Sequence, residues 1–228
     1  MEGLRVVGAP SELANRYYEQ GIDEIIFMDT VASLYGRNTI FETVQEAAKD
    51  VFVPLSAGGG IRTVDDIRIM LRAGADKVAI NTEALKRPEF LSEAANIFGS
   101  QCVLLSVEAK KQPAGGWEAY VENGRERTGK DVIEWVQEAE KLGAGEILLT
   151  SVDQEGTKKG FDQDLIREVH KRVRIPVIAA GGAGACQDVI DILPNVDAVS
   201  CASILHYDIC PLPQLKQAVQ DAGLLVRV

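Results

Sequence analysis

The sequence has few of the residues that build metal centres and disulfide frameworks. Its 228 residues include four cysteines without a CxxC pair and two histidines, His170 and His206, that lie far apart. Zinc sites and disulfide frameworks are usually marked by such residues at short, regular spacings. We therefore expect neither a metal site nor a disulfide framework.

The chain also lacks a surplus of basic residues and any long apolar run. It has 24 basic and 34 acidic residues, for a net charge of −10. This charge opposes generic binding to nucleic acid or to anionic membranes, so an anionic ligand must be captured locally. No apolar run approaches the ~20 residues that span a bilayer, and residues 1–4 differ from the basic start of a signal peptide. We expect a cytoplasmic protein with no nucleic-acid and no membrane partner.

Short apolar runs alternate with longer amphipathic segments along the chain. Runs of this length are typical of strands that are covered on both faces. The predicted strands are 24–28, 53–57, 77–81, 102–107, 146–150, 176–180 and 197–201. The segments 63–73 and 129–142 have apolar residues at helical spacing and are followed by Gly74 and Gly143, which favour helix ends. The alternation predicts one α/β domain over 1–228 with a parallel sheet, either closed as a barrel or open and doubly wound.

An internal repeat favours the closed barrel. Three segments of the first half return 121 or 122 residues later: 21–25 as 143–147, 54–59 as 176–181, and 75–78 as 196–199. Two similar (βα)₄ halves can close into one (βα)₈ barrel, whereas an open sheet has no reason to repeat itself. The repeat partner of the strand 102–107 falls before Met1. We therefore predict a TIM (βα)₈-type barrel of two similar halves that lacks its first strand.

The missing strand would leave two free strand edges. Unpaired edges invite pairing with other chains. We expect either self-association of the protein or an N-terminal segment around 4–7 folded into the gap.

Two glycine-rich segments follow predicted strands at repeat-related positions, 57–62 and 180–184. Ligands of such barrels bind where the strands end, and glycines there let backbone N–H groups approach an anion ahead of a helix N-terminus. Glycines often only serve tight turns, and residues such as Asn81 and Ser203 could simply cap helices, but a repeated pair predicts a ligand with a phosphate at each end. The expected phosphate-binding residues are Gly59, Gly60, Asn81, Thr82, Thr150, Gly156, Gly181, Gly182, Ala202 and Ser203.

Carboxylates at strand ends are candidates for acid/base catalysis, because burial at a barrel mouth raises their pKa toward neutrality. The candidates are Asp29, Glu108, Asp153 and Glu155. Solvation in a loop, or an ion pair with Lys110 or Lys158, explains any one of them equally well. Glu108 is the strongest candidate, since it directly ends a strand between two apolar residues.

The segment 117–124 alternates in polarity and ends in Asn-Gly. This pattern predicts a hairpin on the loop that follows the strand 102–107. We expect the hairpin to act as a flap over the ligand.

Motifs along nearly the whole chain match one known family in order. They are 27–30, 57–62, 74–82, 98–102, 143–151, 153–157 and 179–184. Together they resemble the cyclase subunit of imidazole glycerol phosphate synthase, the HisF family. The run that ends in Leu149-Thr150-Ser151 favours this family over the phosphoribosyl-formimino isomerase of the same pathway.

The resemblance implies one half of a two-protein enzyme of histidine biosynthesis that needs no cofactor. A HisH-type glutaminase, the heterodimer partner, would release ammonia that travels through the barrel. The cyclase would then convert a bis-phosphorylated formimino-aminoimidazole-carboxamide ribonucleotide into imidazole glycerol phosphate and an aminoimidazole-carboxamide ribonucleotide. The family's charged ring that gates ammonia at the opposite face is matched by Glu24, Asp76, Lys77 and Glu146. Ordinary stabilising ion pairs are the alternative for these four residues.

The sequence departs from the family at the mouth. In the family two aspartates end the first and fifth strands; here the first strand falls outside the chain and Glu108 ends the fifth. Glu155 and Ala180 stand where the family tends to have Asp and Ser. Catalytic carboxylates tolerate little displacement, so we expect low turnover. Two other functions stay open: a catalytically impaired barrel that binds phosphorylated ligand or glutaminase, and a related amidotransferase synthase with another substrate, such as a nucleotide sugar.

Overall fold

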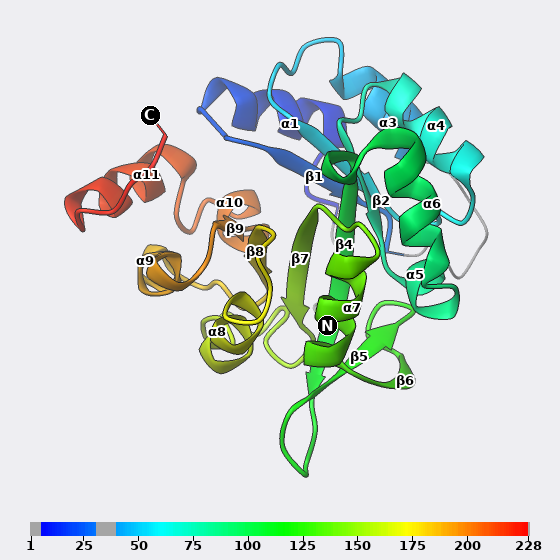
Figure 1. Cartoon of the computed structure of the whole chain (residues 1–228). Helices are drawn as coiled ribbons and strands as arrows, with labels where there is room; N and C mark the ends of the chain where they lie inside the picture. Colours follow the sequence, from blue (N-terminus) through cyan, green and yellow to red (C-terminus); the bar gives the residue numbers. More distant parts are fainter. Residues whose placement is uncertain (1–5, 31–39, 228) are drawn as a thin grey trace.

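The computed structural model describes residues 6–30 and 40–227. Seven parallel strands form a curled sheet, shown in Figure 1. Their spatial order is β1 (Ile25–Met28), β2 (Leu55–Gly58), β3 (Lys77–Ile80), β4 (Val103–Lys111), β7 (Glu146–Ser151), β8 (Val177–Ala180) and β9 (Ala198–Ser200). Every apolar run that was predicted to be a strand is one, and all neighbouring pairs of this path are parallel.

Helices cover the outer face of the sheet. They are α1 (Pro10–Glu19), α3 (Ile40–Ala47), α4 (Val64–Ala73), α5 (Thr82–Lys86), α6 (Glu89–Phe98), α7 (Val132–Lys141), α8 (Gln163–His170), α9 (Cys186–Ile192), α10 (Ser203–His206) and α11 (Leu212–Asp221), with 3₁₀ turns at Ser100–Cys102 and Leu193–Asn195. No helix in these described ranges is long and apolar enough to cross a membrane. The predicted helix 129–142 begins later than expected, because Gly129 has a φ of 74° and residues up to Asp131 belong to a strand. Asp131 then caps α7 through its side chain.

The hydrophobic core has two layers because side chains of a strand alternate between its faces. The larger layer packs between the strands and the helices. The smaller layer fills the inside of the barrel with Ala79, Leu104, Leu148, Ile178 and Ala180. Residues two or four positions further along the same strands point to the same side. The alternation therefore directs the residues at 81, 108 and 150 toward the inside of the mouth.

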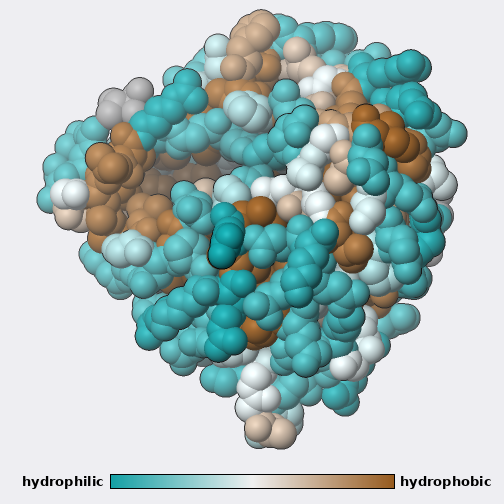
Figure 2. Space-filling model, viewed as in Figure 1, coloured by the Kyte–Doolittle hydropathy of each residue, from teal (hydrophilic) through white to brown (hydrophobic). Residues whose placement is uncertain are grey.

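The barrel is open between β1 and β9, the two ends of the strand path. Within the described ranges no strand pairs with the outer edge of either, which confirms the expected lack of a strand. Residues of both strands are partly exposed, whereas those of β2 and β8 are buried. Figure 2 shows a hollow bordered by apolar side chains on this side, between α1 and α11. Self-association through these edges stays a prediction.

The described part of the N-terminal segment does not close the gap between β1 and β9. Residues 4 and 5 of the predicted filler lie outside the described residues. Val6 and Val7 form no strand, and Val6 is 99% exposed.

The predicted hairpin is present. β5 (Trp117–Val121) runs antiparallel to the far end of β4 and is followed by β6 (Glu126–Asp131). The turn between them contains three successive residues of positive φ, Glu122 at 53°, Asn123 at 58° and Gly124 at 72°. Asn and Gly tolerate this left-handed conformation best, which is why the Asn-Gly pair marked the turn.

Candidate functional site at the barrel mouth

Glu108 lies at the mouth end of β4, opposite Tyr120 of β5 and beside Thr150 of β7. Its Oε2 accepts a hydrogen bond of 2.8 Å from the backbone N–H of Gly124. Burial raises the pKa of this carboxyl group, hydrogen bonds from Gly124 and the Asn81 side chain oppose the rise, and the charge of Glu122 adds to it. The net pKa lies above its ordinary value, so Glu108 keeps its proton to a higher pH than an exposed glutamate. A protonated carboxyl group at this position can act as a general acid.

The first glycine loop lies directly after β2. Gly59 and Gly60 have φ values of 108° and 74°, and a Cβ on Gly59 would lie 2.3 Å from the carbonyl oxygen of Asp29. Only glycine fits this close approach. The structure therefore places Asp29, a predicted catalytic residue, against the first glycine loop.

Asn81 and Thr82 follow β3, next to this loop. The Asn81 Nδ2 donates to the carbonyl oxygen of Tyr120 at 3.2 Å, while its Oδ1 is buried without a hydrogen-bond partner among the described residues. Thr82 is the first residue of the short helix α5.

The second glycine loop borders a cavity of about 70 Å³ at the mouth ends of β8 and β9. The residues that line it are Glu155, Gly156, Ala180, Gly181, Gly182, Ala183, Ser200, Cys201, Ala202 and Ser203. Six residues predicted from the sequence thus gather around one cavity, while Thr150 lies beside Ala180 on the neighbouring strand. Burial raises the pKa of Glu155, the predicted carboxylate among them.

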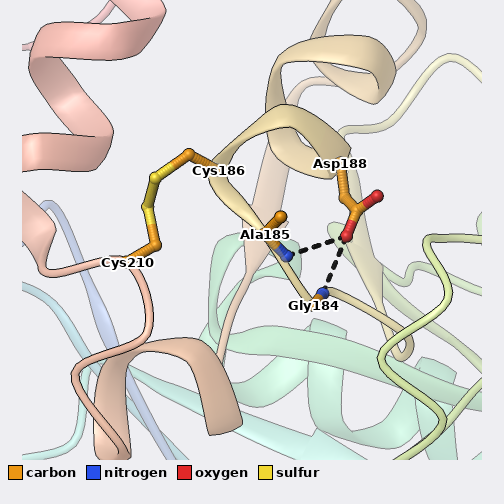
Figure 3. Close-up of a disulfide and its surroundings, with 5 residues drawn as sticks. All are labelled: Gly184, Ala185, Cys186, Asp188 and Cys210. Carbon is orange, nitrogen blue, oxygen red and sulfur yellow. Dashed lines mark hydrogen bonds between the residues drawn. A yellow bond between two sulfur atoms is a disulfide. The ribbon is translucent and has the colours of Figure 1, made fainter.

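The N-termini of α4 and α9 are occupied by carboxylates of their own helices. Asp66 accepts hydrogen bonds from the backbone N–H groups of Arg62 and Thr63. Asp188, its repeat partner, accepts from Gly184 and Ala185 at 2.8 and 2.9 Å, as Figure 3 shows. From the glycine pattern, these helix ends were expected to attract an anion. The loop amides at 59–60 and 181–182 are instead the candidate donors.

A disulfide joins Cys186 and Cys210 (Figure 3), a single bond that the expectation of no disulfide framework did not foresee. The two residues are 24 positions apart in sequence with Cα atoms at 5.7 Å. The fold brings the first residue of α9 beside the segment between α10 and α11, a contact that spacing alone does not reveal. The bond joins two segments that each follow a residue of the cavity lining, Ala183 before Cys186 and Ser203 before Cys210. Cys201, which lines the cavity, is not bonded, and burial raises the pKa of its thiol to about 12.

A charged cluster lies at the opposite end of the barrel, where the strands begin. The Lys77 Nζ is 2.9 Å from Glu24 Oε2 and 2.6 Å from Glu146 Oε2, and the Ser56 hydroxyl donates to Glu24 Oε1 at 2.6 Å. Burial alone would lower the pKa of Lys77, but the hydrogen bonds and charges of Glu146 and Glu24 outweigh it and raise the pKa. Three of the four predicted ring residues are therefore in contact.

Asp76, the fourth predicted ring residue, makes a different contact. Its carboxylate accepts a 2.8 Å hydrogen bond from the backbone N–H of Leu55. Asp197, its repeat partner, bonds in the same way to Val177. Each aspartate thus accepts a hydrogen bond from the first residue of the neighbouring strand, β2 for Asp76 and β8 for Asp197.

Two contributors to the mouth were not singled out from the sequence. The Gly124 amide donates a hydrogen bond to Glu108, and the negative charge of Glu122 makes a small contribution to the raised pKa of Glu108. The Asn-Gly pair located the turn but not which side chains fold inward. Within 6–30 and 40–227, no cluster of three His, Cys, Asp or Glu residues is arranged to hold a metal.

The parallel (βα) barrel with two repeat-related glycine loops and a half-buried carboxyl group at one mouth defines a class of protein, a (βα)-barrel with its candidate small-molecule site at the strand ends. A sequence profile of the family described as "Histidine biosynthesis protein" matches residues 1–211. The imidazole glycerol phosphate synthase subunit HisF of Legionella pneumophila is 60% identical over 188 residues, which cover 82% of this chain and 89% of that protein. HisF subunits of Streptococcus sanguinis and Streptococcus gordonii are 48% and 47% identical over 227 residues, or 99% of this chain and 90% of theirs. The chain belongs to the HisF family, as its motifs predicted.

Proposed function

We propose that this chain is the ammonia-using cyclase subunit of imidazole glycerol phosphate synthase. Its substrate would be the bis-phosphorylated formimino-aminoimidazole-carboxamide ribonucleotide, and its products imidazole glycerol phosphate and an aminoimidazole-carboxamide ribonucleotide. The observation that carries the proposal is the pair of glycine loops at one mouth, with Glu108 on a strand between them. A ligand with a phosphate at each end fits this arrangement.

Each phosphate would be held by residues from one half of the repeat. One group consists of Gly59, Gly60, Asn81 and Thr82, and the other of Thr150, Gly156, Gly181, Gly182, Ala202 and Ser203. Glu108 would donate a proton to the bond that breaks, since burial raises the pKa of its carboxyl group. Asp29 and Glu155, each beside a glycine loop, are the further candidates for proton transfer.

A HisH-type glutaminase would dock at the end where the strands begin. Lys77 bridges Glu24 and Glu146 there, with side chains 20%, 24% and 17% exposed. This charged cluster would control the entry of ammonia. A purely stabilising ion-pair cluster remains the alternative account, and the contacts of Asp76 with Leu55 fit that account better than the gate.

Binding without turnover is a second candidate function, which the open edge between β1 and β9 favours. The family's first strand carries one of its two aspartates, as the resemblance implies, and the described residues hold no equivalent strand. Both candidates share the prediction that the bis-phosphorylated ligand binds.

Replacing Gly182 by Ala is expected to weaken binding of the bis-phosphorylated substrate. Gly182 has a φ of 110°, and a Cβ there would lie 2.1 Å from the carbonyl oxygen of Gly160, so the loop must move. Loss of one hydrogen bond to a charged group costs about 1.5–3 kcal/mol, roughly a 10- to 100-fold rise in Kd. Isothermal titration calorimetry measures the change.

The matched control is Gly21→Ala. Gly21 also has a positive φ, 84°, but no atom lies within 4 Å of its added Cβ and it precedes β1 at the other end of the barrel. This variant should keep the affinity of the unmodified chain. Equal Kd values for the unmodified chain and Gly182→Ala, with Gly182→Ala folded by circular dichroism, would rule out the second phosphate site.

A further inference from the structure

The Cys186–Cys210 disulfide closes a loop of chain that contains one wall of the cavity at the second glycine loop. Cys186 is the first residue of α9 and follows the glycine loop 180–184, and Cys210 lies between α10 and α11. The cavity residues 200–203, which belong to the end of β9 and the start of α10, lie inside the closed loop. The other wall, 180–183, ends shortly before Cys186. The bond therefore links the two walls covalently.

Backbone hydrogen bonds connect each end of the disulfide to its wall. The Cys210 N–H donates to the carbonyl oxygen of Ile204 in α10 at 3.1 Å. On the other side, Asp188 in the first turn of α9 accepts from the N–H groups of Gly184 and Ala185 (Figure 3). A movement of either end of the bond is therefore passed to residues in or next to the cavity lining.

The second glycine loop is held between α9 and the segment before α8. The Gly160 N–H donates to the carbonyl oxygen of Gly182 at 2.9 Å. No backbone hydrogen bond of the described residues joins α9 to α10 or to 207–211. Breaking the disulfide would leave side-chain packing to hold α9 against this segment, and the glycine loop would move with α9.

This crosslink belongs to the second half of the repeat alone. By the 122-residue offset, the position equivalent to Cys186 is Val64, the first residue of α4, which cannot form a disulfide. Asp66 and Asp188 are equivalent and cap the two helices in the same way. Reduction would therefore affect one glycine loop and leave the other as an internal reference.

The two bonded cysteines differ in access to solvent. Cys210 is fully buried, whereas Cys186 is partly exposed. Exchange begins with attack of a thiolate on one sulfur of the bond, so Cys186 is the sulfur attacked and Cys210 is the leaving group. Cys201 lines the cavity, but burial raises the pKa of its thiol to about 12, which leaves little of the thiolate that exchange requires. The attacking thiol is therefore an external one.

We propose that Cys186–Cys210 is a thiol–disulfide exchange site that controls how firmly the second glycine loop is held, with a dithiol as its reductant. A thiolate of the reductant would bond to the Sγ of Cys186, the S–S bond would break, and Cys210 would leave as a thiolate and take up a proton. The second thiol of the reductant would then displace Cys186, which also takes up a proton, and close the reductant's own disulfide. Two electrons and two protons would thus pass to the protein.

The inference rests on the proposed function and adds to it the redox control of one phosphate site. Isothermal titration calorimetry with the bis-phosphorylated substrate measures this control. Reduction is expected to raise Kd about 10-fold, because a loosened loop must be ordered before it binds. Equal Kd values for the oxidised and reduced forms would overturn the proposal.

Hydrogen–deuterium exchange of the free, full chain provides a test that needs no substrate. After treatment with dithiothreitol, the amides of 181–185 and 202–210 are expected to exchange about 10-fold faster, because the crosslink no longer restrains their local opening. The first glycine loop, 57–62, should exchange equally in both forms. Equal exchange at 181–185 in the two forms, or four free thiols after oxidation of the chain with diamide, would contradict the proposal.

Cys186→Ser removes the bond by changing the partly exposed partner. Its exchange should match the reduced form and should not respond to dithiothreitol. Cys102→Ser is the matched control, since it removes an unbonded cysteine just before β4, and it should keep both the oxidised pattern and the response. If Cys186→Ser does not fold, the two forms of the unmodified chain decide alone. Faster exchange on reduction in a protein that binds the substrate in neither form would retain the exchange site and reject the proposed function instead.

Discussion

Addition of a first strand that ends in Asp is expected to raise ammonia-dependent cyclase turnover about 10²–10⁴-fold, the usual contribution of a positioned acid or base. One carboxyl group cannot readily donate and accept protons on opposite sides of the bond being broken, and the raised pKa of Glu108 suits it to the donating role. The open edges of β1 and β9 offer the added strand parallel partners on both sides. The initial rate of imidazole glycerol phosphate formation with excess ammonium salt, which bypasses the glutaminase, measures the effect.

The matched control is the same extension ending in Asn, which fills the gap without the carboxylate. It should restore the strand but not the rate. High turnover by the chain without any extension would contradict the expected need for a second carboxylate.

Glu108→Gln in the extended chain is expected to lower the same rate about 10²–10⁴-fold, because the amide keeps the shape of the side chain but cannot donate the proton. The pH dependence of the rate provides an independent test of the role of Glu108. The raised pKa of Glu108 predicts a limb on which activity falls as the pH rises through that pKa, and the variant should lack this limb.

Glu126→Gln, an exposed change on the hairpin, should keep both the rate and the limb. An unchanged rate in Glu108→Gln would show that the acid/base chemistry belongs to other residues, with Asp29 and Glu155 the next candidates.

Much of the fold could be predicted from local patterns. Apolar runs located the strands, and the repeat predicted that 57–62 and 180–184 would occupy equivalent places. The late start of α7 was missed because the apolar residues of 129–142 have helical spacing from the beginning of the segment. In the structure, Gly129 and its neighbours up to Asp131 belong to the hairpin strand β6. The occupied N-termini of α4 and α9 were visible in the sequence as acidic residues three positions after the helix caps.

Other features depend on tertiary contacts that spacing does not encode. Cys186 and Cys210 meet only because α9 packs beside the segment that follows α10. Asp76 lies next to Lys77 in sequence, yet successive residues of a strand point to opposite sides, and Asp76 bonds to Leu55 instead. The inward fold of Glu122 depends on a turn whose side-chain directions a sequence pattern does not give.

A crystal structure with the bis-phosphorylated substrate would show whether one barrel mouth holds this small molecule by a phosphate at each end. One phosphate is expected at the amides of 59–60 and 81–82 and the other in the cavity lined by Gly156, Gly182 and Ser203. A substrate bound with either phosphate elsewhere on the barrel would contradict this expectation.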